Sequence, residues 1–517
     1  METLKNNLEE QNKNLANFQE EQKSNPEQEA NPQHKDVLFF DAPYHSDQEL
    51  AYSMIKDSGQ NMDLPRGMLS ISSYMQQHEL TSSVIPLDSY IYPEIQDLSQ
   101  AEMTQKMYNI IDQKVHDADP KIIAFGLMYT FTEPIVLEMT SHTKSKFPDK
   151  KVVVGGNHAT FSDLELLDPS AKTGIDIVVR FEGEETMVKL TQELQKPNPD
   201  LAKIKGISYV NERGKIVQNS PRERMNLYQI PPLDYSSIDS PEGLEKFNQT
   251  AMFIRGCKGN CAFCTSPNYW SRELSENSIN NFEQELEFLA KNGVEIIGIL
   301  DDDILASEQG FESIIKSLEK IKTKYPTTRF IAQTRVTHFR NPEQNQEKLT
   351  KMKQAGVDRL YVGIESGSQQ ILNQMAKGYK VEWVKPALEN IKDAGIETGG
   401  FWLFGHPGAT KEEENRSLAF MEELLEKRLL DDVEAHCVVP FPGTRIAKDL
   451  RVQVFDHNKK HYGLLNNYPV YNLVNPETGK IEMSASEIFG FLQQALEIRK
   501  KYLGIEANLA NRPLEKN

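Results

Sequence analysis

The residues of this chain best suited to chemistry lie in one short stretch. Three of the four cysteines, Cys257, Cys261 and Cys264, fall within residues 255–264, which read RGCKGNCAFC. Because this loop is polar and rich in glycine, three incidental core cysteines are a poor explanation, and the C-x3-C-x2-C spacing indicates a thiolate metal site.

Two metal sites compete for these thiolates. A closed zinc site needs a fourth ligand, for which Cys437 is the remaining cysteine, and zinc sites usually pair two C-x2-C units, whereas this loop has one. An iron–sulfur cube held by three cysteines would leave one iron without a protein ligand, and an open iron can bind a substrate. The spacing favours the iron–sulfur cluster.

Composition restricts the possible partners. The 517 residues contain 58 Lys and Arg against 76 Asp and Glu, a net charge of −18, which argues against binding to nucleic-acid backbones or anionic membranes. Four cysteines do not make a disulfide framework, so we expect a reducing compartment, the cytoplasm. No apolar run is long enough to span a membrane. We expect residues 1–35 to be a disordered tail rather than a signal peptide.

The elements that must position the cysteine loop come in two series of alternating strands and helices. Residues 36–200 contain short apolar strands at 36–40, 121–130, 151–160 and 176–186, with helices between them. This pattern predicts an α/β domain with a doubly wound parallel sheet, whose ligands bind at the carboxyl ends of the strands. Residues 201–249, with a hairpin and a proline-rich stretch, are expected to be a linker.

The second series runs from 250 to 445 and has six strand–helix steps. It predicts a partial (βα)6 barrel with its site at the carboxyl ends of the strands, and the cysteines directly follow the first strand. Residues 446–517 are expected to be mostly helical and to shape the substrate pocket.

The cysteine loop resembles the signature of the radical S-adenosylmethionine (SAM) enzymes, including the aromatic residue before the third cysteine. The resemblance extends to other segments along residues 250–445: LDDDIL (300–305), AQTRV (332–336), YVGIESGSQQILNQMAKGY (361–379), GGFWLFGHPGATKEE (399–413) and VPFPGT (439–444). It implies that Cys257, Cys261 and Cys264 hold a [4Fe-4S] cluster. The open iron would chelate SAM, and one electron from the cluster would cleave it to a 5′-deoxyadenosyl radical.

The same resemblance implies roles for four further residues. Phe263 would face the adenine, Glu365 and Ser366 would contact the ribose or methionine part of SAM, and Arg335 would bind its carboxylate. The structural alternative is that Glu365 is an ordinary strand-end carboxylate with Arg335 as its salt-bridge partner. The acidic run Asp301, Asp302 and Asp303 is expected to form hydrogen bonds at the barrel mouth, rather than a divalent-metal site.

The first domain resembles the cobalamin-binding domain that precedes many radical SAM barrels. The matching stretches are PRGMLSISSYMQQHEL (65–80), IIAFGLMYTFT (122–132), VVVGGNHATF (152–161) and DIVVRFEGEETMVKL (176–190). The residues implied near cobalamin are Tyr129, Thr130, Gly155, Gly156, His158, Glu182 and Gly183. The stretch DAPYHSDQEL lacks the D-x-H-x-x-G pattern that supplies a cobalt ligand, so His45 is expected to be an ordinary loop histidine. A sheet without cofactor is the alternative.

Together the resemblances imply a cobalamin-dependent radical SAM enzyme, with methyl transfer to an unactivated carbon or phosphorus of a small molecule. One SAM would methylate the reduced cobalamin, a second would provide the radical, and a protein such as flavodoxin or ferredoxin would donate the electron. Ring formation without methyl transfer, as in the anaerobic porphyrin-ring cyclases, is the main alternative. A methylthiotransferase would need three further N-terminal cysteines, and a zinc- or cluster-stabilised binding protein is the non-enzymatic alternative.

Overall fold

The computed structural model describes residues 34–43, 62, 64–94, 97–247, 249–339, 342–455 and 469–504. The chain divides into two compact units, residues 1–249 and 250–517, and each is described by itself. Most of the expected N-terminal tail, and His45, lie outside the described residues.

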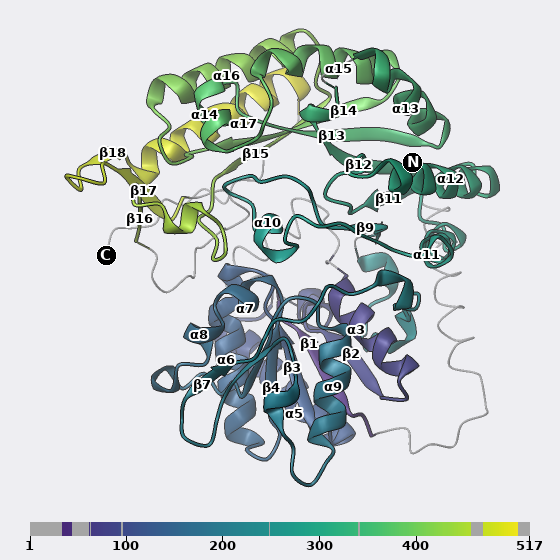
Figure 1. The fold of residues 1–517 in the computed structure, drawn as a ribbon, viewed down its shortest axis with the longest axis vertical. Helices are drawn as coiled ribbons and strands as arrows, with labels where there is room; N and C mark the ends of the chain where they lie inside the picture. The colour runs from purple at the N-terminus through teal and green to yellow at the C-terminus, as the bar shows by residue number, and fades with distance from the viewer. Residues whose placement is uncertain are drawn as a thin grey trace. The chain divides into compact units, whose positions relative to one another are not determined.

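A seven-stranded sheet forms the centre of the first unit (Figure 1). Its strands follow the order β2-β1-β3-β4-β5-β6-β7. Five are parallel: β1 (Val37–Asp41), β2 (Ser82–Pro86), β3 (Ile122–Gly126), β4 (Lys151–Gly155) and β5 (Ile177–Val179). The chain leaves β1 toward β2 and then crosses to β3 on the other side, so β1 and β3 form the switch point at which such sheets bind ligands.

The linker expected at 201–249 is wrong for its first part. Strands β6 (Ile207–Val210) and β7 (Ile216–Gln218) form a hairpin that extends the sheet in antiparallel fashion from β5. The buried side chains of Ile207 and Tyr209 explain this, because they add to the core on one face of the sheet. A hairpin pattern in a sequence does not tell which sheet edge it joins.

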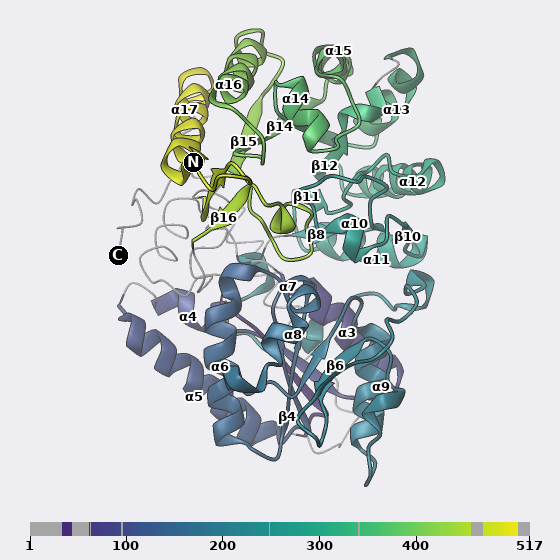
Figure 2. The ribbon, with the colours of Figure 1, turned by 60° about the vertical axis from the view of Figure 1, so that its left-hand side comes forward.

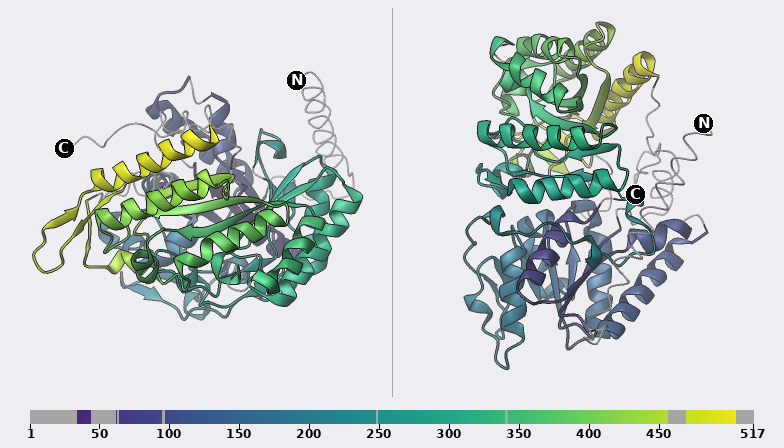
Figure 3. Two further views of the ribbon diagram at one scale, coloured as in Figure 1. Left: turned by 90° about the horizontal axis from the view of Figure 1, so that it is seen from above. Right: turned by 90° about the vertical axis from the view of Figure 1, so that its right-hand side faces the viewer.

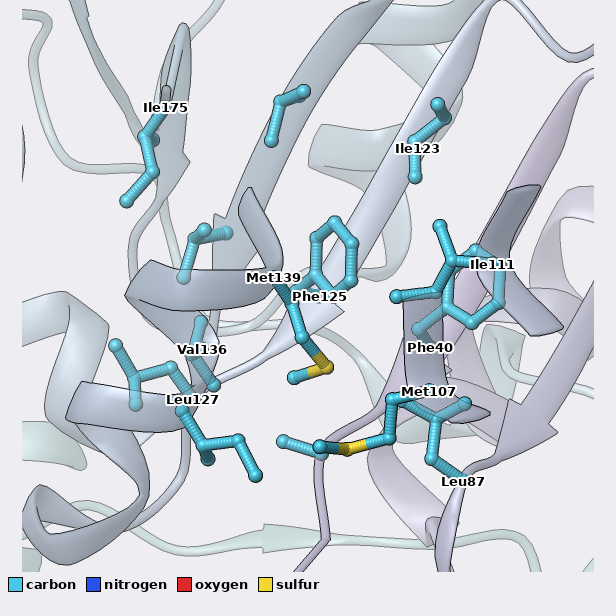
Figure 4. Close-up of a cluster of buried hydrophobic side chains, with 14 of the residues drawn as sticks. Phe40, Leu87, Met107, Ile111, Ile123, Phe125, Leu127, Val136, Met139 and Ile175 are labelled. Carbon is cyan, nitrogen blue, oxygen red and sulfur yellow. The ribbon is translucent and has the colours of Figure 1, made fainter. Parts of the chain in front are cut away.

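Both faces of this sheet are covered, as the sequence predicts. Leu38 and Phe40 point toward α5 (Gln100–Ala118) and α6 (Glu133–Lys146), in a core that Figure 4 shows in close-up. Val37 and Phe39 pack with residues of α3 (Arg66–Gln77) and α9 (Glu184–Leu194). Successive strand residues point to opposite faces, and both sets are apolar here, so these strands are continuous hydrophobic runs.

The second unit contains an open sheet of six parallel strands in the order β15-β14-β13-β12-β11-β8 (Figure 2). These strands are β8 (Thr250–Ala251), β11 (Ile296–Ile299), β12 (Arg329–Arg335), β13 (Val357–Glu365), β14 (Glu397–Phe404) and β15 (Asp432–Cys437). The helices between them are α11 (Ile279–Lys291), α12 (Glu308–Lys324), α13 (Pro342–Gln354), α15 (Val384–Asp393) and α16 (Lys411–Glu426). The predicted partial (βα)6 arrangement is therefore confirmed as a parallel sheet with alternating helices.

The first predicted strand of this series is divided. After β8 the chain forms β9 (Ile254–Arg255), which leaves the six-stranded sheet and pairs in antiparallel fashion with β10 (Ser275–Glu276). Asp301 stabilises the break, because its carboxylate accepts hydrogen bonds from the backbone N–H groups of Phe253 and Ile254 at 2.8 and 2.9 Å. The cysteine loop starts directly after β9.

Burial alternates along β12 and separates its two faces. On β12 the side chains of Phe330, Ala332 and Thr334 are buried, whereas those between them, up to Arg335, are half-buried. The two-residue period of a strand puts Arg335 on the face opposite the fully buried side chains.

The residues after 445 are only partly helical. Helix α17 (Ala485–Leu503) is present and runs beside α16 (Figure 3), but β16 (Val452–Val454), β17 (Tyr471–Val474) and β18 (Ile481–Met483) form a small antiparallel sheet before it. The expectation of a mostly helical region misses these short strands. None of the described helices is long and apolar enough to cross a membrane.

Candidate functional site

The three cysteines lie in one half-buried loop whose backbone turns toward the sulfurs. The N–H of Gly259 donates to Cys257 Sγ at 3.3 Å, and the N–H of Ser266 donates to Cys264 Sγ at 3.4 Å. Backbone hydrogen bonds to thiolates help to set the reduction potential of iron–sulfur clusters. Burial raises the pKa of Cys257 and raises that of Cys264 to about 12. Coordination to a metal favours the thiolate and so acts against this effect of burial.

The loop is attached to the turns that follow β13, β14 and β15. Ala262 donates its N–H to the carbonyl of Met375 at 2.9 Å and accepts one from Arg445 at 3.1 Å. The ring of Phe263 packs with Leu403 and with two groups of buried apolar residues: Ala262, Val438 and Ile446, and Ile371, Met375 and Ala409. These contacts fix the cysteines at the carboxyl ends of the strands, where such folds place their chemistry.

Within the described ranges, no three His, Cys, Asp or Glu side chains are grouped so that they could hold one metal ion. A zinc site gathers all its ligands around one ion, whereas each thiolate of a [4Fe-4S] cube binds a different iron. Cys437 is buried in the core and does not complete a zinc site.

The acidic run after β11 makes hydrogen bonds, as expected. Asp302 accepts from Ser266 Oγ at 2.7 Å, next to the cysteine loop. Asp303 accepts from Thr334 Oγ1 at 3.0 Å and contacts His338 Nε2 at 2.6 Å. Their oxygens are committed to the framework of the site.

A buried ion pair that the sequence interpretation missed lies beside the loop. Lys377 Nζ donates to Glu365 Oε1 at 2.8 Å, and both residues are about 5% exposed. Burial alone would lower the pKa of Lys377, but the Glu365 carboxylate and the Cys261 sulfur outweigh it and raise that pKa. The ammonium also lies 5.7 Å from the centre of the Phe263 ring. Lys377 therefore pairs with Glu365 and lies near the ring of Phe263.

Glu365 itself has an unfavourable backbone. Its φ is 64°, in the left-handed region, and the pairing of β13 with β14 shifts register at this residue. Non-glycine residues held in this region concentrate at functional sites. The conformation brings the carboxylate to Lys377 rather than to Arg335, so the alternative salt bridge between Glu365 and Arg335 is wrong.

Arg335 and Ser366 lie close to these groups but differ in accessibility. Arg335 Nη2 donates to the carbonyl of Lys377 at 3.2 Å, and its guanidinium lies against Gly259, where an added Cβ would be 3.3 Å from Cζ. Ser366 is fully buried, and its hydroxyl accepts the N–H of Ser368 at 3.1 Å. Arg335 is thus beside the cysteine loop, while Ser366 shapes the turn after β13. Their contacts with SAM, and those of Phe263 and Glu365, stay predictions.

In the first unit, the expected cofactor residues gather where β1, β3 and β4 end together. The register aligns Asp41, Gly126 and Gly155 across the three strands. In the next turns, His158 is buried, with Nδ1 3.0 Å from Thr130 Oγ1 and Nε2 in contact with Glu133 Oε2. Because both ring nitrogens have partners, His158 is not free to bind cobalt in this conformation. Glu133 is a further residue that the sequence interpretation missed.

The Gly-Gly turn after β4 allows two chain segments to approach closely. Gly156 has φ 123°, and a Cβ there would lie 2.6 Å from the carbonyl oxygen of Leu127. Tyr129, stacked on Phe131 at 5.4 Å, is 38% exposed on this same edge. An exposed aromatic ring beside a turn without side chains suits a large cofactor that lies against the sheet edge.

Glu182 and Gly183 have internal roles in the structure. Glu182 is buried and accepts hydrogen bonds from Arg224 Nε at 3.0 Å and the N–H of Met225 at 2.9 Å. An added Cβ at Gly183 would meet Ile71 Cδ1 at 2.7 Å, which shows how closely α9 begins against α3. Contacts of these two residues with cobalamin stay predictions.

Comparisons with known proteins agree with this geometry. Residues 64–191 match the B12 binding domain and residues 252–421 match the radical SAM superfamily. The chain is 31% identical, over 57% of its length, to an uncharacterized methyltransferase of Pyrococcus horikoshii, and 25% identical, over 64%, to the anaerobic magnesium-protoporphyrin IX monomethyl ester cyclase of Synechocystis. It spans 62% and 65% of the lengths of these relatives.

Among solved structures, the radical SAM methyltransferase TsrM from Kitasatospora setae, with cobalamin and a [4Fe-4S] cluster bound, superposes with a TM-score of 0.66. The match covers 90% of this chain and 91% of TsrM at 15% identity, a level that shows a shared fold. The two matched domains follow each other in the order expected from the sequence. The chain therefore contains a B12 binding domain followed by a radical SAM domain, whose cofactors are cobalamin, SAM and a [4Fe-4S] cluster.

Proposed function

We propose that this protein is a cobalamin-dependent radical SAM methyltransferase that acts on an unactivated carbon or phosphorus centre of a small-molecule or natural-product intermediate. The observation that carries the proposal is the three-cysteine loop, attached at the carboxyl ends of β13, β14 and β15 in a chain that also contains a B12 binding domain. The names of the Pyrococcus relative and of TsrM support methyl transfer.

When bound, the cluster supplies one electron for SAM cleavage and cobalamin supplies a carrier for the methyl group. The chain's own groups would hold and orient these cofactors. Cys257, Cys261 and Cys264 would ligate three of the four irons, which leaves one site for SAM. Glu365 offers a carboxylate to the amino group of SAM, and Arg335 offers a guanidinium to its carboxylate.

In such a reaction, the main contribution of the protein is to hold the cofactors and the reacting groups in fixed positions. The turns after β13 and β14 are held by buried contacts, such as Lys377 with Glu365 at 2.8 Å and Gly405 N–H with Glu414 at 2.7 Å. Rigid attachment keeps the reacting groups oriented and reduces the entropy that must be lost in the reaction. An apolar wall around Phe263 would exclude water from a reactive radical.

Anaerobic reconstitution with iron and sulfide tests the proposal. We expect a brown protein that cleaves SAM, and we expect Cys261→Ala to lose iron and deoxyadenosine formation because the cube loses a ligand. Cys437→Ala is the matched control, since Cys437 is buried outside the loop and should leave both unchanged. Continued deoxyadenosine formation by Cys261→Ala would contradict the assignment.

The ratio of products separates methyl transfer from cyclisation, the second candidate, which the Synechocystis relative favours. A methyltransferase should form one S-adenosylhomocysteine and one deoxyadenosine for each methylated product. A cyclase should form deoxyadenosine without S-adenosylhomocysteine.

We also propose that the electron comes from a protein such as flavodoxin or ferredoxin, and that the enzyme works in the cytoplasm. Three cysteines kept free as cluster ligands, in a chain with four cysteines, suit a reducing compartment. Reduction of the reconstituted cluster by reduced flavodoxin would support this part of the proposal.

A further inference from the structure

Three exposed cations lie on the cysteine loop and the segments attached to it. Lys258 is in the loop itself, directly after Cys257. Arg272 donates from Nε and Nη2 to the carbonyl of Lys258, both at 3.3 Å, and Arg445 donates from Nη2 to the carbonyl of Asn260 at 2.5 Å. Two arginines from different parts of the sequence therefore donate to the same three-residue stretch, 258–260.

In the part of the chain that the structure describes, these charges have no ion-pair partner. Among the described residues, no carboxylate lies within 4.0 Å of the charged groups of Lys258, Arg272 or Arg445. Exposed lysines on the outer helices are commonly paired, as in Lys351 with Glu312 at 2.9 Å and Lys501 with Glu422 at 2.7 Å. Arg335, behind the loop, adds a fourth cation whose hydrogen bond goes to a carbonyl group.

The backbone that presents Arg272 is unfavourable. Ser271 and Arg272 both have positive φ, at 52° and 59°, although neither is glycine. Two successive left-handed residues are costly for L-amino acids and persist only where the surroundings require them. The strained turn keeps a guanidinium on the exposed side of the cysteine loop.

The location of these charges matters because the chain as a whole is acidic. A net charge of −18 would repel an acidic protein from most of the surface. A local group of unpaired cations reverses the sign of the potential at one place and can accelerate the encounter with a negatively charged partner. That place is the loop that carries the cluster ligands.

We infer that Lys258, Arg272 and Arg445 form an electron-entry face, a docking surface for an acidic one-electron carrier protein. This inference rests on the proposed function, which requires an external electron. In the step, a flavin hydroquinone on the carrier loses one electron and becomes a semiquinone, and the cluster takes that electron and passes from the 2+ to the 1+ state. Arg272 and Arg445 bind the carrier's carboxylates while they also hold the loop.

The test uses the full-length reconstituted protein and reduced flavodoxin as the probe. Semiquinone formation is followed by stopped flow for the wild type, Lys258→Glu and the double variant Lys258→Glu/Arg272→Glu. The control for the single variant is Arg213→Glu, at an exposed arginine of the β6–β7 turn, which makes the same charge change as Lys258→Glu far along the chain. Reduction by methyl viologen, a small cationic donor, reports whether each cluster can still accept an electron.

We expect the flavodoxin rate of the double variant to fall about tenfold or more at low ionic strength, with the viologen rate within about twofold of wild type. The wild-type rate should fall steeply as salt is added, and that dependence should weaken in the variants. An unchanged flavodoxin rate in both variants overturns the inference.

Equal decreases in the rates of reduction by flavodoxin and by viologen also overturn the inference, since the cations would then act on the cluster and not on docking. An electron paramagnetic resonance redox titration checks this case, because a tenfold change in the reduced-to-oxidised ratio is a shift of about 59 mV for a one-electron couple. If viologen reduces neither the wild type nor any variant, the protein has no reducible cluster. That result contradicts the proposed function, and it differs from the results that contradict the docking surface.

Discussion

At the scale of single residues, some groups of the candidate site could be predicted from the sequence and others could not. The cysteines could be predicted because their type and spacing are rare outside metal sites. Lys377 could not, since a lysine after a short helix is usually solvated, and its burial depends on the turn that brings it to Glu365. The roles of Glu133 and Arg272 likewise depend on contacts between distant loops.

Removing one member of the buried pair should be costly. We expect Lys377→Met to destabilise the protein by about 3–5 kcal/mol, because Glu365 would keep a buried charge without its partner. The double variant Lys377→Met/Glu365→Gln should recover much of that loss. Urea unfolding of the wild type, of the single variants Lys377→Met and Glu365→Gln, and of the double variant gives the coupling energy. Additive effects would contradict the pair's energetic role.

Gly156 should be intolerant of any side chain. We expect Gly156→Ala to lower the free energy of unfolding by about 1–3 kcal/mol and to weaken cobalamin binding, because the Cβ would displace the turn after β3. Equilibrium dialysis with hydroxocobalamin measures the binding.

Gly214→Ala is the matched control for this substitution. Gly214 also has a positive φ, at 71°, but nothing lies within 4 Å of an added Cβ. It should therefore show only the cost of the left-handed backbone, about 1 kcal/mol, and normal cobalamin binding. If the two substitutions changed the free energy of unfolding and cobalamin binding equally, the close approach of Gly156 to Leu127 would not explain the effect of Gly156→Ala.

At the scale of elements, periodicity predicts the strands and helices that bury a full face. The alternation of short strand-like runs with helical patterns located the six parallel strands of the second unit. It failed for β16, β17 and β18, which have three or four residues each, and for the break between β8 and β9. Such short segments are stabilised by tertiary contacts, as with Asp301 at the break, and these are absent from local sequence patterns.

Helix α16 contributes a buried carboxyl group, and its protonation should make the free energy of unfolding depend on pH. Glu414 is completely buried, accepts the N–H of Gly405 and has no hydrogen-bond partner at Oε2 among the described residues. Burial raises its pKa from 4.5 to about 8, so the folded protein binds a proton that the unfolded chain releases above about pH 4.5. Its contribution to the free energy of unfolding therefore decreases as pH rises from about 4.5 to about 8.

Glu414→Gln tests this linkage. The amide has no proton to lose, so the variant should gain stability relative to wild type between about pH 5.5 and about pH 8.5. Thermal melts at both pH values measure the difference. A constant difference between the two proteins would show that Glu414 is ionised in the folded state.

At the scale of the whole molecule, the order of the two domains was predictable because each has its own sequence pattern. The chain divides at residues 249 and 250, and each unit has its own sheet. The linker expected at 201–249 was misplaced because the β6–β7 hairpin belongs to the first sheet. The substrate was not predictable, since no motif in the chain specifies it.

Separate units should bind their cofactors separately. We expect Cys257→Ala to lose iron and retain hydroxocobalamin, and Gly156→Val to lose hydroxocobalamin and retain iron, because the ligands of each cofactor lie in different units. Iron content and corrin absorbance per chain, measured after gel filtration, check both expectations. Loss of both cofactors in either variant would mean that the sites depend on each other.

Helix α17 has a practical consequence for shortened forms of the protein. It packs along β15, the terminal strand of the parallel sheet, and Arg499 pairs with Asp432 at 2.9 Å. A truncation before residue 485 would remove the buried apolar side chains of α17, among them Ile488, Leu492 and Ala495, and expose the apolar surface that they cover. Exposed apolar patches of this kind promote aggregation. Shortened forms made for crystallisation should therefore keep the chain through at least Leu503. We expect forms that end before residue 485 to be expressed as insoluble inclusion bodies.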